Sequence, residues 1–176
     1  NGIVFACDDT AAVDSQRQRF LTFALDVNKD LDRCGFTLCK GNIMASNPEW
    51  CLTLDEWQEQ FSTWIRVPQP EALLNATIFF DFRPLFGKFE LAESLRRHLL
   101  IQTQSSPMFL KAMAHNALDV EPPLGKIRDF LTDLEPGHPG KIDLKKYGSR
   151  IFVDVARIYA LSTGVHNSNT VQRLRL

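Results

Sequence analysis

The chain has 176 residues, of which 44% are hydrophobic, and a formal net charge of −1. A chain of this size can bury roughly 70% of its unfolded surface, so it can form one medium domain, or two small ones that share a core, without disulfides. The near-neutral charge argues against binding to duplex nucleic acid and leaves single nucleotides or protein partners open.

The four cysteines and four histidines show no metal-ligand spacing, and no C-x-x-C pair occurs. Free thiols in a reducing cytoplasm are the better interpretation. No apolar run is long enough to cross a bilayer, and no signal peptide opens the sequence. The chain begins at Asn1 inside a strand-like run and ends in a helical pattern, so we expect a fragment of a longer cytoplasmic protein.

The first part of the chain is predicted to form a strand and then a helix. Residues 2–7 are short and apolar, which favours a buried strand. Asp9 or Thr10 can cap the helix that follows, and Gly35 is expected to end it. The apolar stripe of this helix recurs at three-to-four spacing and consists of Phe20, Ala24, Val27, Leu31 and Cys34.

Residues 36–40 alternate weakly and predict a second strand, which a polar loop follows at 41–50. Thr53 and Glu56 form a capping box that opens another helix. One side of this helix carries Leu54, Trp57, Phe61 and Trp64. Such a stripe predicts core packing rather than a surface for base stacking.

The clearest strand pattern covers residues 76–83, where apolar side chains alternate with a face that carries Asp81 and Arg83. A carboxylate within an apolar strand is costly to bury alone. Asp81 is therefore expected either to pair with Arg83 at a half-exposed sheet surface or to bind Mg²⁺, with Arg83 near a phosphate. The residues by themselves leave both alternatives open.

The second half is predicted to be mostly helical, with one helix carrying Leu91, Leu95 and Leu99 and another beginning at Ser106-Pro107. Residues 141–146 alternate like a strand, with Leu144 inward and Lys145 outward. On the helix that follows, Phe152, Val155 or Ala156, and Tyr159 are expected inward. Arg157 is expected outward, where it can pair with Asp154 at i,i+3.

The composition shifts near residues 102–106, which predicts an α/β part at 1–103 and a helical part at 104–176. The predicted fold class is α/β plus α (α+β), a small mixed sheet with helices on its outer side followed by a helical subdomain.

Two further groups of residues are candidates for binding. Lys40, Gly41 and Asn42 follow the predicted second strand, where glycine allows close backbone approach and lysine can meet a phosphate. The alternative for these three is an ordinary turn. Asn47 and Trp50 could shape a base or acceptor pocket, although Trp50 fits the core equally well. Lys145 and Arg157 could contact a phosphate or an acidic partner, or could form a solvated ion-pair face.

Several motifs occur in the order found in one bacterial family. They are residues 39–50 with Trp57 and Trp64-Ile65, then 78–87, 122–125, 142–145, 156–161, and Thr170 with Arg173-Leu174. Each motif is weak alone. Together, over nearly the whole chain, they resemble the nucleotidyltransferases found beside CBS and cyclic-nucleotide-binding domains in bacterial signalling proteins, which are similar to PII-uridylyltransferases.

This resemblance implies a polymerase-beta-like nucleotidyltransferase domain within 1–103, without its N-terminal Gly-Ser and Asp-x-Asp motifs, and a helical substrate-binding domain within 104–176. Asp81 and Arg83 match the family's third-carboxylate motif, so the resemblance implies a catalytic role for both and an Mg²⁺ ligand in Asp81. It further implies nucleotide or substrate contacts at Lys40, Gly41, Asn42, Asn47, Lys145 and Arg157.

The implied activity is transfer of a uridylyl or adenylyl group from an NTP to a protein or small acceptor, assisted by metal ions that bridge carboxylates and phosphate. With two of three carboxylates missing, we expect the fragment by itself to be inactive. Two alternatives from other classes remain: a regulatory module of a CBS-domain signalling protein that senses a nucleotide without transferring it, and a purely protein-binding helical domain.

Overall fold

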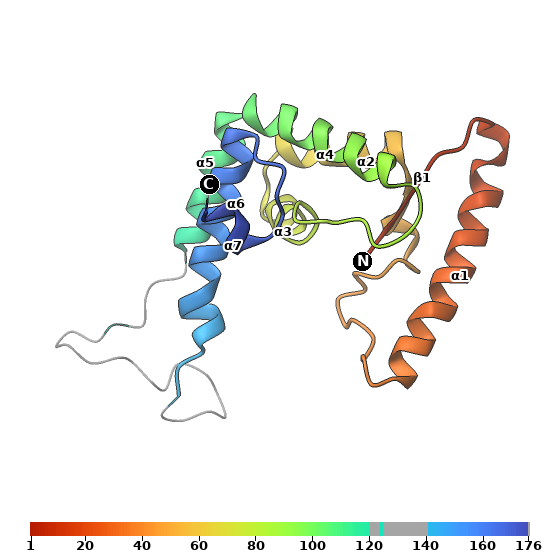
Figure 1. Cartoon of the computed structure of the whole chain (residues 1–176), viewed down its shortest axis with the longest axis horizontal. Helices are drawn as coiled ribbons and strands as arrows, with labels where there is room; N and C mark the ends of the chain where they lie inside the picture. The colour runs from red at the N-terminus through yellow and green to blue at the C-terminus, as the bar shows by residue number, and fades with distance from the viewer. Residues whose placement is uncertain (120–123, 125–140, 176) are drawn as a thin grey trace. The chain divides into compact units, whose positions relative to one another are not determined.

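The computed structural model describes residues 1–119, 124 and 141–175 (Figure 1). This part of the chain is mostly helical and contains one small parallel sheet, consistent with the predicted α+β class. It divides into two compact units: the first is Asn1–Phe61 with Pro84–Arg97, and the second is Ser62–Arg83 with His98–Leu176. The predicted boundary between residues 103 and 104 separates two family domains. The division into compact units does not test it, so it stays a prediction.

The sheet of the first unit has two strands, β1 (Ile3–Phe5) and β2 (Cys51–Thr53), paired in parallel with Ile3 opposite Cys51. The predicted strand at 2–7 is therefore confirmed in its centre. No sequence pattern predicts β2, because a three-residue strand between a loop and a capping box has no room for a recognisable alternation.

Helix α1 (Val13–Arg33) follows a short 3₁₀ turn, η1 (Thr10–Ala12). Asp9 caps that turn by accepting a hydrogen bond from the backbone N–H of Ala11 at 2.9 Å, as predicted. Gly35 ends α1 in the left-handed conformation with φ 93°, also as predicted. The N–H groups of Gly35 and Phe36 return to Asp32 and Leu31, which is a Schellman motif.

The expected apolar stripe of α1 is only partly buried. Ala24 is buried, whereas Val27 and Leu31 are 38% and 40% exposed. The predicted strand at 36–40 is wrong, because these residues form no strand and pair with no neighbour. They leave the Schellman turn as irregular chain, with the N–H of Leu38 donating to Asp32.

Helix α2 (Leu54–Arg66) begins at the predicted capping box. The Thr53 N–H donates to Glu56 at 2.7 Å, and the Glu56 N–H donates to the Thr53 hydroxyl at 3.2 Å. Trp57 and Phe61 are buried in the first unit with their rings edge-on at 5.6 Å. The predicted core stripe of this helix is therefore confirmed.

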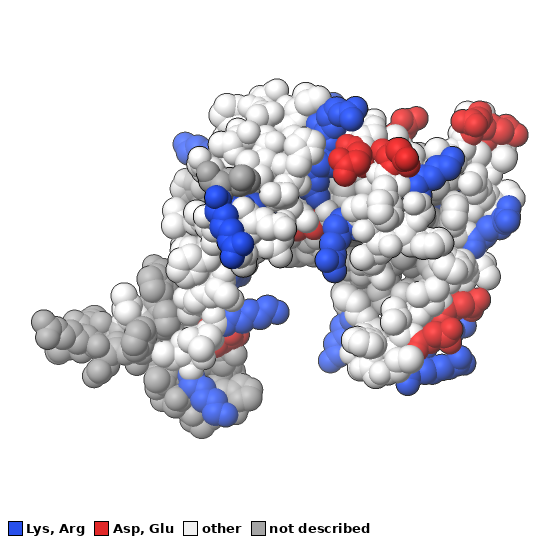
Figure 2. All heavy atoms as spheres, in the orientation of Figure 1, with Lys and Arg blue, Asp and Glu red and all other residues white. Residues whose placement is uncertain are grey.

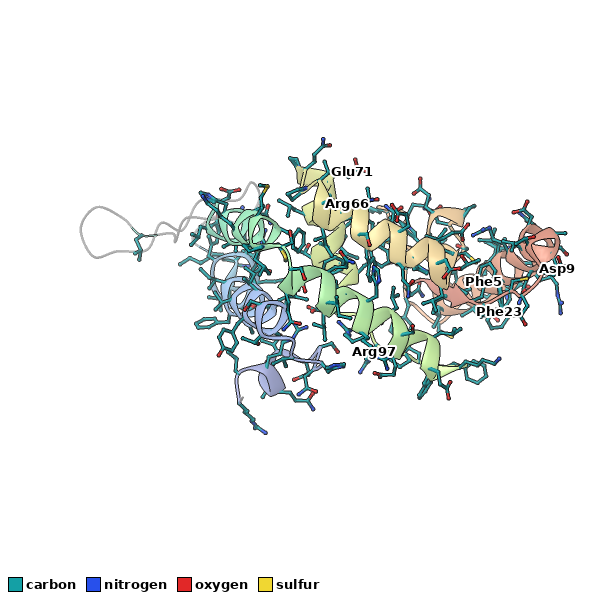
Figure 3. All side chains as sticks on the ribbon, turned by 90° about the horizontal axis from the view of Figure 1, so that it is seen from above. Phe5, Asp9, Phe23, Arg66, Glu71 and Arg97 are labelled. Carbon is teal, nitrogen blue, oxygen red and sulfur yellow. The ribbon has the colours of Figure 1, made fainter. Side chains whose placement is uncertain are left out.

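The first unit is joined across β1, β2 and α1 by a few specific contacts. Phe5 of β1 packs on Phe20 of α1 with ring centroids 5.3 Å apart, and Figure 3 shows Phe5 beside that helix. Trp57 donates its indole N–H to the Ile3 carbonyl at 2.8 Å. Arg17 reaches from α1 to the Cys51 carbonyl and to Glu56, so one guanidinium joins α1, β2 and α2.

The predicted strand at 76–83 is wrong. Its first residues belong to helix α3 (Pro70–Phe79), which begins at a proline in the first helical position and ends at the cap Phe80. Ala72, Leu73, Ala76 and Phe79 are all buried. The opposite side of α3 also carries apolar residues, since Leu74 and Ile78 are 59% and 41% exposed. Without a polar face, the apolar run is read as easily with a period of two as with a period of 3.6.

The second unit continues with helices predicted from the sequence. Helix α4 (Phe89–Gln104) ends in it, and helix α5 (Pro107–Leu118) follows, with Pro107 at its first position. Its core contains Trp64, Phe80 and Phe109. The ring centroid of Phe80 lies 6.2 Å from that of Trp64 and 5.9 Å from that of Phe109. Thr103 is fully buried, and its hydroxyl lies 3.2 Å from the carbonyl of Leu161, which belongs to helix α6 (Arg150–Thr163).

The predicted strand at 141–146 is also wrong. The Asp143 carboxylate accepts hydrogen bonds from the N–H groups of Lys146 and Lys145, at 3.0 and 2.8 Å, and thereby caps a π-helical turn, η3 (Lys145–Ser149). These bonds lower the pKa of Asp143. Leu144, expected inward, is 76% exposed, because a helical turn does not send alternate residues to opposite faces.

Helix α6 (Arg150–Thr163) follows η3 and lies beside α5 (Figures 1 and 3). Gly164 ends it with φ 74°, and helix α7 (Thr170–Arg173) comes after a short loop. Phe152 and Tyr159, expected inward, are 63% and 59% exposed, whereas Ala156 and Ala160 are buried. The small residues face the core because they let α6 approach α5 closely.

No described helix combines the length and the apolarity that a membrane span requires. Figure 2 shows basic and acidic side chains interspersed on the visible face of the described residues, without one large field of either sign. This distribution agrees with the net charge of −1.

Replacing Glu56 by Gln tests the contact that joins the elements of the first unit. Burial raises the pKa of Glu56, but hydrogen bonds from Arg17 and Thr53 outweigh it, so the net pKa is lowered. Glu56 therefore contributes stability that is complete above its unfolded pKa of about 4.3 and is lost as the pH falls through the lower folded value.

We expect E56Q to lower the free energy of unfolding at neutral pH by about 1 kcal/mol. The difference from the wild type should shrink as the pH approaches about 3, in thermal melts followed by circular dichroism. Asp55→Asn removes an exposed carboxylate from the same helical turn and is the control. An equal loss in D55N, or a difference for E56Q that persists in acid, would contradict this role for Glu56.

Candidate functional site

A cluster of charged residues in the second unit surrounds Asp81. Arg157 of α6 donates from Nε to Asp81 Oδ2 at 2.9 Å, and its Nη2 lies 2.7 Å from the same oxygen. Arg173 of α7 places Nη1 2.7 Å from Asp81 Oδ1. One carboxylate therefore faces two guanidiniums that come from different helices, while its own side chain is 22% exposed.

Each guanidinium also has a second partner. Arg157 donates from Nη1 to Asp154 Oδ1 at 2.6 Å, one turn back on the same helix. Arg173 donates from Nε to the Asn167 carbonyl at 2.6 Å. Arg150 approaches the other oxygen of Asp154 at 3.4 Å. Arg157 and Arg173 are thus each held in place by their own segment of chain as well as by Asp81.

Local sequence brings Arg173 to this position. The left-handed Gly164 ends α6 and turns the chain, with the N–H of Val165 returning to the Ala160 carbonyl. Asn169 then caps α7 by accepting a hydrogen bond from the Gln172 N–H at 3.2 Å. Glycine and asparagine are typical of these cap positions, but no sequence pattern indicates that Arg173 is buried beside Asp81. Its burial depends on packing that no local pattern encodes.

The structure changes the interpretation of two predicted site residues. Arg83 is exposed, and within the described residues no ion pair joins it to Asp81, so the predicted Asp81–Arg83 pair is wrong. Arg157 was expected on a solvated face and is instead only 6% exposed. The predicted Asp154–Arg157 pair does form, but it is buried rather than exposed. Lys145 is exposed, as expected.

The arrangement around Asp81 does not fit Mg²⁺. The ion needs several oxygen ligands, usually including carboxylates that converge on it. Both oxygens of Asp81 face guanidiniums, and the nearby Asp154 is bound by arginines as well. No group of three or more His, Cys, Asp or Glu that could hold a metal occurs among the described residues. The chemistry of this cluster is that of ion pairing.

A second candidate region is the loop of the first unit that carries Lys40, Gly41 and Asn42. Asn42 adopts a left-handed φ of 55°, and its N–H donates to the Cys39 carbonyl at 3.0 Å, which closes a tight turn. Lys40, Gly41 and Asn42 are all exposed on this turn. Their predicted contact with a phosphate is therefore sterically open.

Asn47 and Trp50 hold this loop in shape. The Asn42 carbonyl accepts hydrogen bonds from Trp50 Nε1 at 3.2 Å and from Asn47 Nδ2 at 3.1 Å. Asn47 Oδ1 caps the 3₁₀ turn η2 (Pro48–Trp50) through the Glu49 N–H at 3.0 Å. Trp50 is buried, with its ring stacked on Trp57 at 6.2 Å. Both side chains support the loop through contacts within the unit.

The loop is also tied to the elements around it. Asn1 accepts a hydrogen bond from the Ala45 N–H at 2.8 Å. The buried Asn28 of α1 donates to the Ser46 hydroxyl at 2.8 Å. The turn at Lys40 is consequently an exposed tip on a loop that is anchored at several points behind it.

The pKa of Cys39 indicates which sign of charge the tip of this loop stabilises. Hydrogen bonds from the backbone N–H groups of Ile43 and Gly41 lower the pKa of its exposed thiol. The sulfur therefore lies where the backbone of the turn stabilises negative charge, and Lys40 follows it directly in the sequence. An exposed turn with inward-facing N–H groups and an adjacent lysine can accept an anion in the same way.

The surface of the second unit also has an apolar groove of about 370 Å³ between α5 and α6. Its lining includes Ala117 and Leu118 from α5 and Val155 and Tyr159 from α6. Leu118 and Tyr159 are 68% and 59% exposed. The groove can take apolar side chains, whereas the cluster around Asp81 offers charged groups.

Comparison with known families assigns the two ends of the chain. Residues 1–71 match the family model described as "Putative nucleotidyltransferase DUF294". Residues 107–176 match the model described as "Putative nucleotidyltransferase substrate binding domain". No match was found among curated proteins or solved structures. The two ends of the chain are therefore similar, in that order, to a domain described as a nucleotidyltransferase and to the substrate-binding domain of the same family.

The Cys39 environment predicts an order of thiol reactivity. Cys39 has a lowered pKa and is exposed, whereas burial raises the pKa of Cys51. Because the thiolate is the reactive form, iodoacetamide at neutral pH should label Cys39 first and Cys51 last. Cys34 is also exposed and is the matched control. Peptide mass spectrometry of a time course would disprove the prediction if Cys34 reacted as fast as Cys39.

The contacts of Asp81 predict a large effect of its removal on stability. Asp81→Asn leaves two buried guanidiniums without their carboxylate, which we expect to cost about 3 kcal/mol in the free energy of unfolding. Arg83→Gln removes an exposed charge two residues away and should change it by no more than about 0.5 kcal/mol. Urea unfolding followed by circular dichroism measures both, and similar losses in the two variants would refute this account.

Proposed function

We propose that the protein takes part in nucleotidyl transfer from an NTP to a protein or small acceptor in bacterial signal transduction. The observation that carries this proposal is the presence, in order on one chain, of a nucleotidyltransferase segment and of a segment from the substrate-binding domain of the same family. In this arrangement, residues 1–71 serve the nucleotide and residues 107–176 serve the acceptor. The resemblance to proteins with CBS or cyclic-nucleotide-binding domains suggests regulation by such modules.

On the nucleotide side, the exposed turn at Lys40 is the proposed contact for the triphosphate. Lys40 supplies a point charge, and Gly41 and Asn42 let the backbone approach closely. The lowered pKa of Cys39 supports this role, since the backbone N–H groups of the turn already favour a negative charge. Asn47 acts indirectly in this proposal, by holding the Asn42 carbonyl and so the shape of the turn.

On the acceptor side, Lys145 is an exposed cation at the start of η3 and is available to an acidic acceptor. Arg157 is buried in the cluster around Asp81 and contributes through that cluster. Arg83, which is exposed after α3, remains a candidate for phosphate contact. The proposal assigns no step to Asp81 as a metal ligand, because its surroundings do not fit one.

The rival proposal is a module that binds a nucleotide without transferring it. Both proposals predict binding of an NTP with Mg²⁺, and only the first predicts loss of pyrophosphate and movement of the α-phosphate. The full-length protein should be incubated with each of the four NTPs, labelled in parallel reactions at the α-phosphate or at the γ-phosphate, in an extract of the source organism. Transfer of α-label but not of γ-label supports the transferase, and binding without transfer overturns it in favour of the sensor.

Substitution of Lys40 tests the nucleotide contact directly. Loss of one charge-assisted contact with phosphate should weaken NTP affinity about five- to tenfold, measured by calorimetry on the full-length protein with Mg²⁺. Lys29 is an exposed lysine on α1 of the same unit, so Lys29→Ala is the matched control and should leave the affinity unchanged. Equal affinities of K40A and K29A would exclude the turn from nucleotide binding.

A further inference from the structure

Asp81 and the two arginines that hold it differ in whether they lie within a segment that matches a family model. Arg157 and Arg173 lie within the segment that matches the substrate-binding domain, whereas Asp81 lies between the two matched segments. Asp81 also belongs to no helix or strand, since it follows the cap of α3. The guanidiniums are therefore part of the substrate-binding segment, and the carboxylate is supplied to them by the connecting chain.

We propose that Arg157 and Arg173 form an oxyanion-binding site, which the side chain of Asp81 occupies in this structure and which a phosphate or carboxylate group of a ligand takes over when Asp81 withdraws. The proposal deepens the proposed function and rests on it in one respect, that the ligand is the acceptor. The site itself follows from the geometry of the two arginines.

The arginines are positioned without Asp81. Asp154 holds Nη1 of Arg157 at 2.6 Å, and the Asn167 carbonyl holds Nε of Arg173 at 2.6 Å. Removal of Asp81 would therefore leave both guanidiniums in place, with the N–H groups that now face the carboxylate directed at the vacated position. Such preorganisation is what allows a pair of arginines to bind an oxyanion without a further ordering cost.

The fit of Asp81 to the site is incomplete. Arg173 Nη1 and Asp81 Oδ1 approach to 2.7 Å, but their angles do not make a hydrogen bond, and both atoms are buried without another hydrogen-bond partner. The side chain of Arg173 is only 1% exposed. A buried donor without a hydrogen bond is unfavourable, so a ligand with better placed oxygens would gain this bond as well.

Charge and access favour an external anion. Three arginines (Arg150, Arg157, Arg173) face two carboxylates (Asp81, Asp154), so withdrawal of Asp81 would leave an excess of two positive charges. The 22% exposure of the Asp81 side chain gives solvent access to the place it occupies. A phosphate monoester brings up to two negative charges and three oxygens, which suits two guanidiniums better than a single carboxylate does.

The test is anion rescue of an Asp81→Ala variant of the full-length protein. Alanine removes the carboxylate and opens its space, so D81A should melt at a lower temperature than the wild type. Inorganic phosphate or acetate should raise the melting temperature of D81A in a saturable manner, beyond the effect of sodium chloride at equal ionic strength. A lower saturating concentration for phosphate identifies a phosphate ligand, and the reverse identifies a carboxylate ligand.

Two controls test whether the stabilisation by anions is specific to the position of Asp81 and depends on Arg157. Asp119→Ala removes an exposed carboxylate of the same unit and should show no saturable response. Adding Arg157→Gln to D81A should abolish the response. The proposal is overturned if phosphate and acetate stabilise D81A no more than D119A, or if D81A with R157Q responds equally.

If D81A does not fold, calorimetry of phosphate binding to a second variant, D81N, tests the same site. Asp81→Asn keeps the shape of the side chain but loses its charge, so inorganic phosphate should bind D81N at least about tenfold more tightly than the wild type, a difference of 1.4 kcal/mol. Equal affinities would overturn the proposal. Neither experiment uses an NTP or measures transfer, so the oxyanion site and the proposed function can fail separately.

Discussion

The second unit depends on one carboxylate shared by two buried arginines. Asp81 pairs with both Arg157 and Arg173, and without its charge the burial of the two guanidiniums would cost several kcal/mol. The turn after α3, the middle of α6 and the short helix α7 meet at this point although they are far apart in sequence. α7, at only four residues, is too short to be stable by itself, and Arg173 attaches it to the unit.

The first unit is organised by polar contacts of another kind. Arg17 binds Glu56 and the Cys51 carbonyl, while asparagines at positions 1, 28 and 47 hold the loop that carries Lys40. Neutral amides suit this purpose, since each can donate and accept and none needs a counter-ion. The result is an exposed turn on a fixed base, and loops held on a rigid scaffold often carry binding residues.

The two candidate sites differ in what they offer a ligand. The turn at Lys40 is open and weakly cationic, and its backbone donors already favour a negative charge at Cys39. The cluster around Asp81 is buried and strongly cationic, but an internal carboxylate occupies it. In a protein that brings a nucleotide and an acceptor together, the first would remain accessible at all times, and the second would depend on displacement of Asp81.

By itself, the sequence determined the features whose causes are local. Asp9, Gly35 and the Thr53–Glu56 box mark helix ends through hydrogen bonds within a few residues, and the order of family motifs was enough to indicate a nucleotidyltransferase with its substrate-binding domain. Only the tertiary structure decided that residues 76–79 are helical and that Asp81 meets Arg157 and Arg173 rather than Arg83. Periodicity cannot separate a buried helix from a buried strand, and a carboxylate selects its partner across 76 residues of chain only after packing has brought the two together.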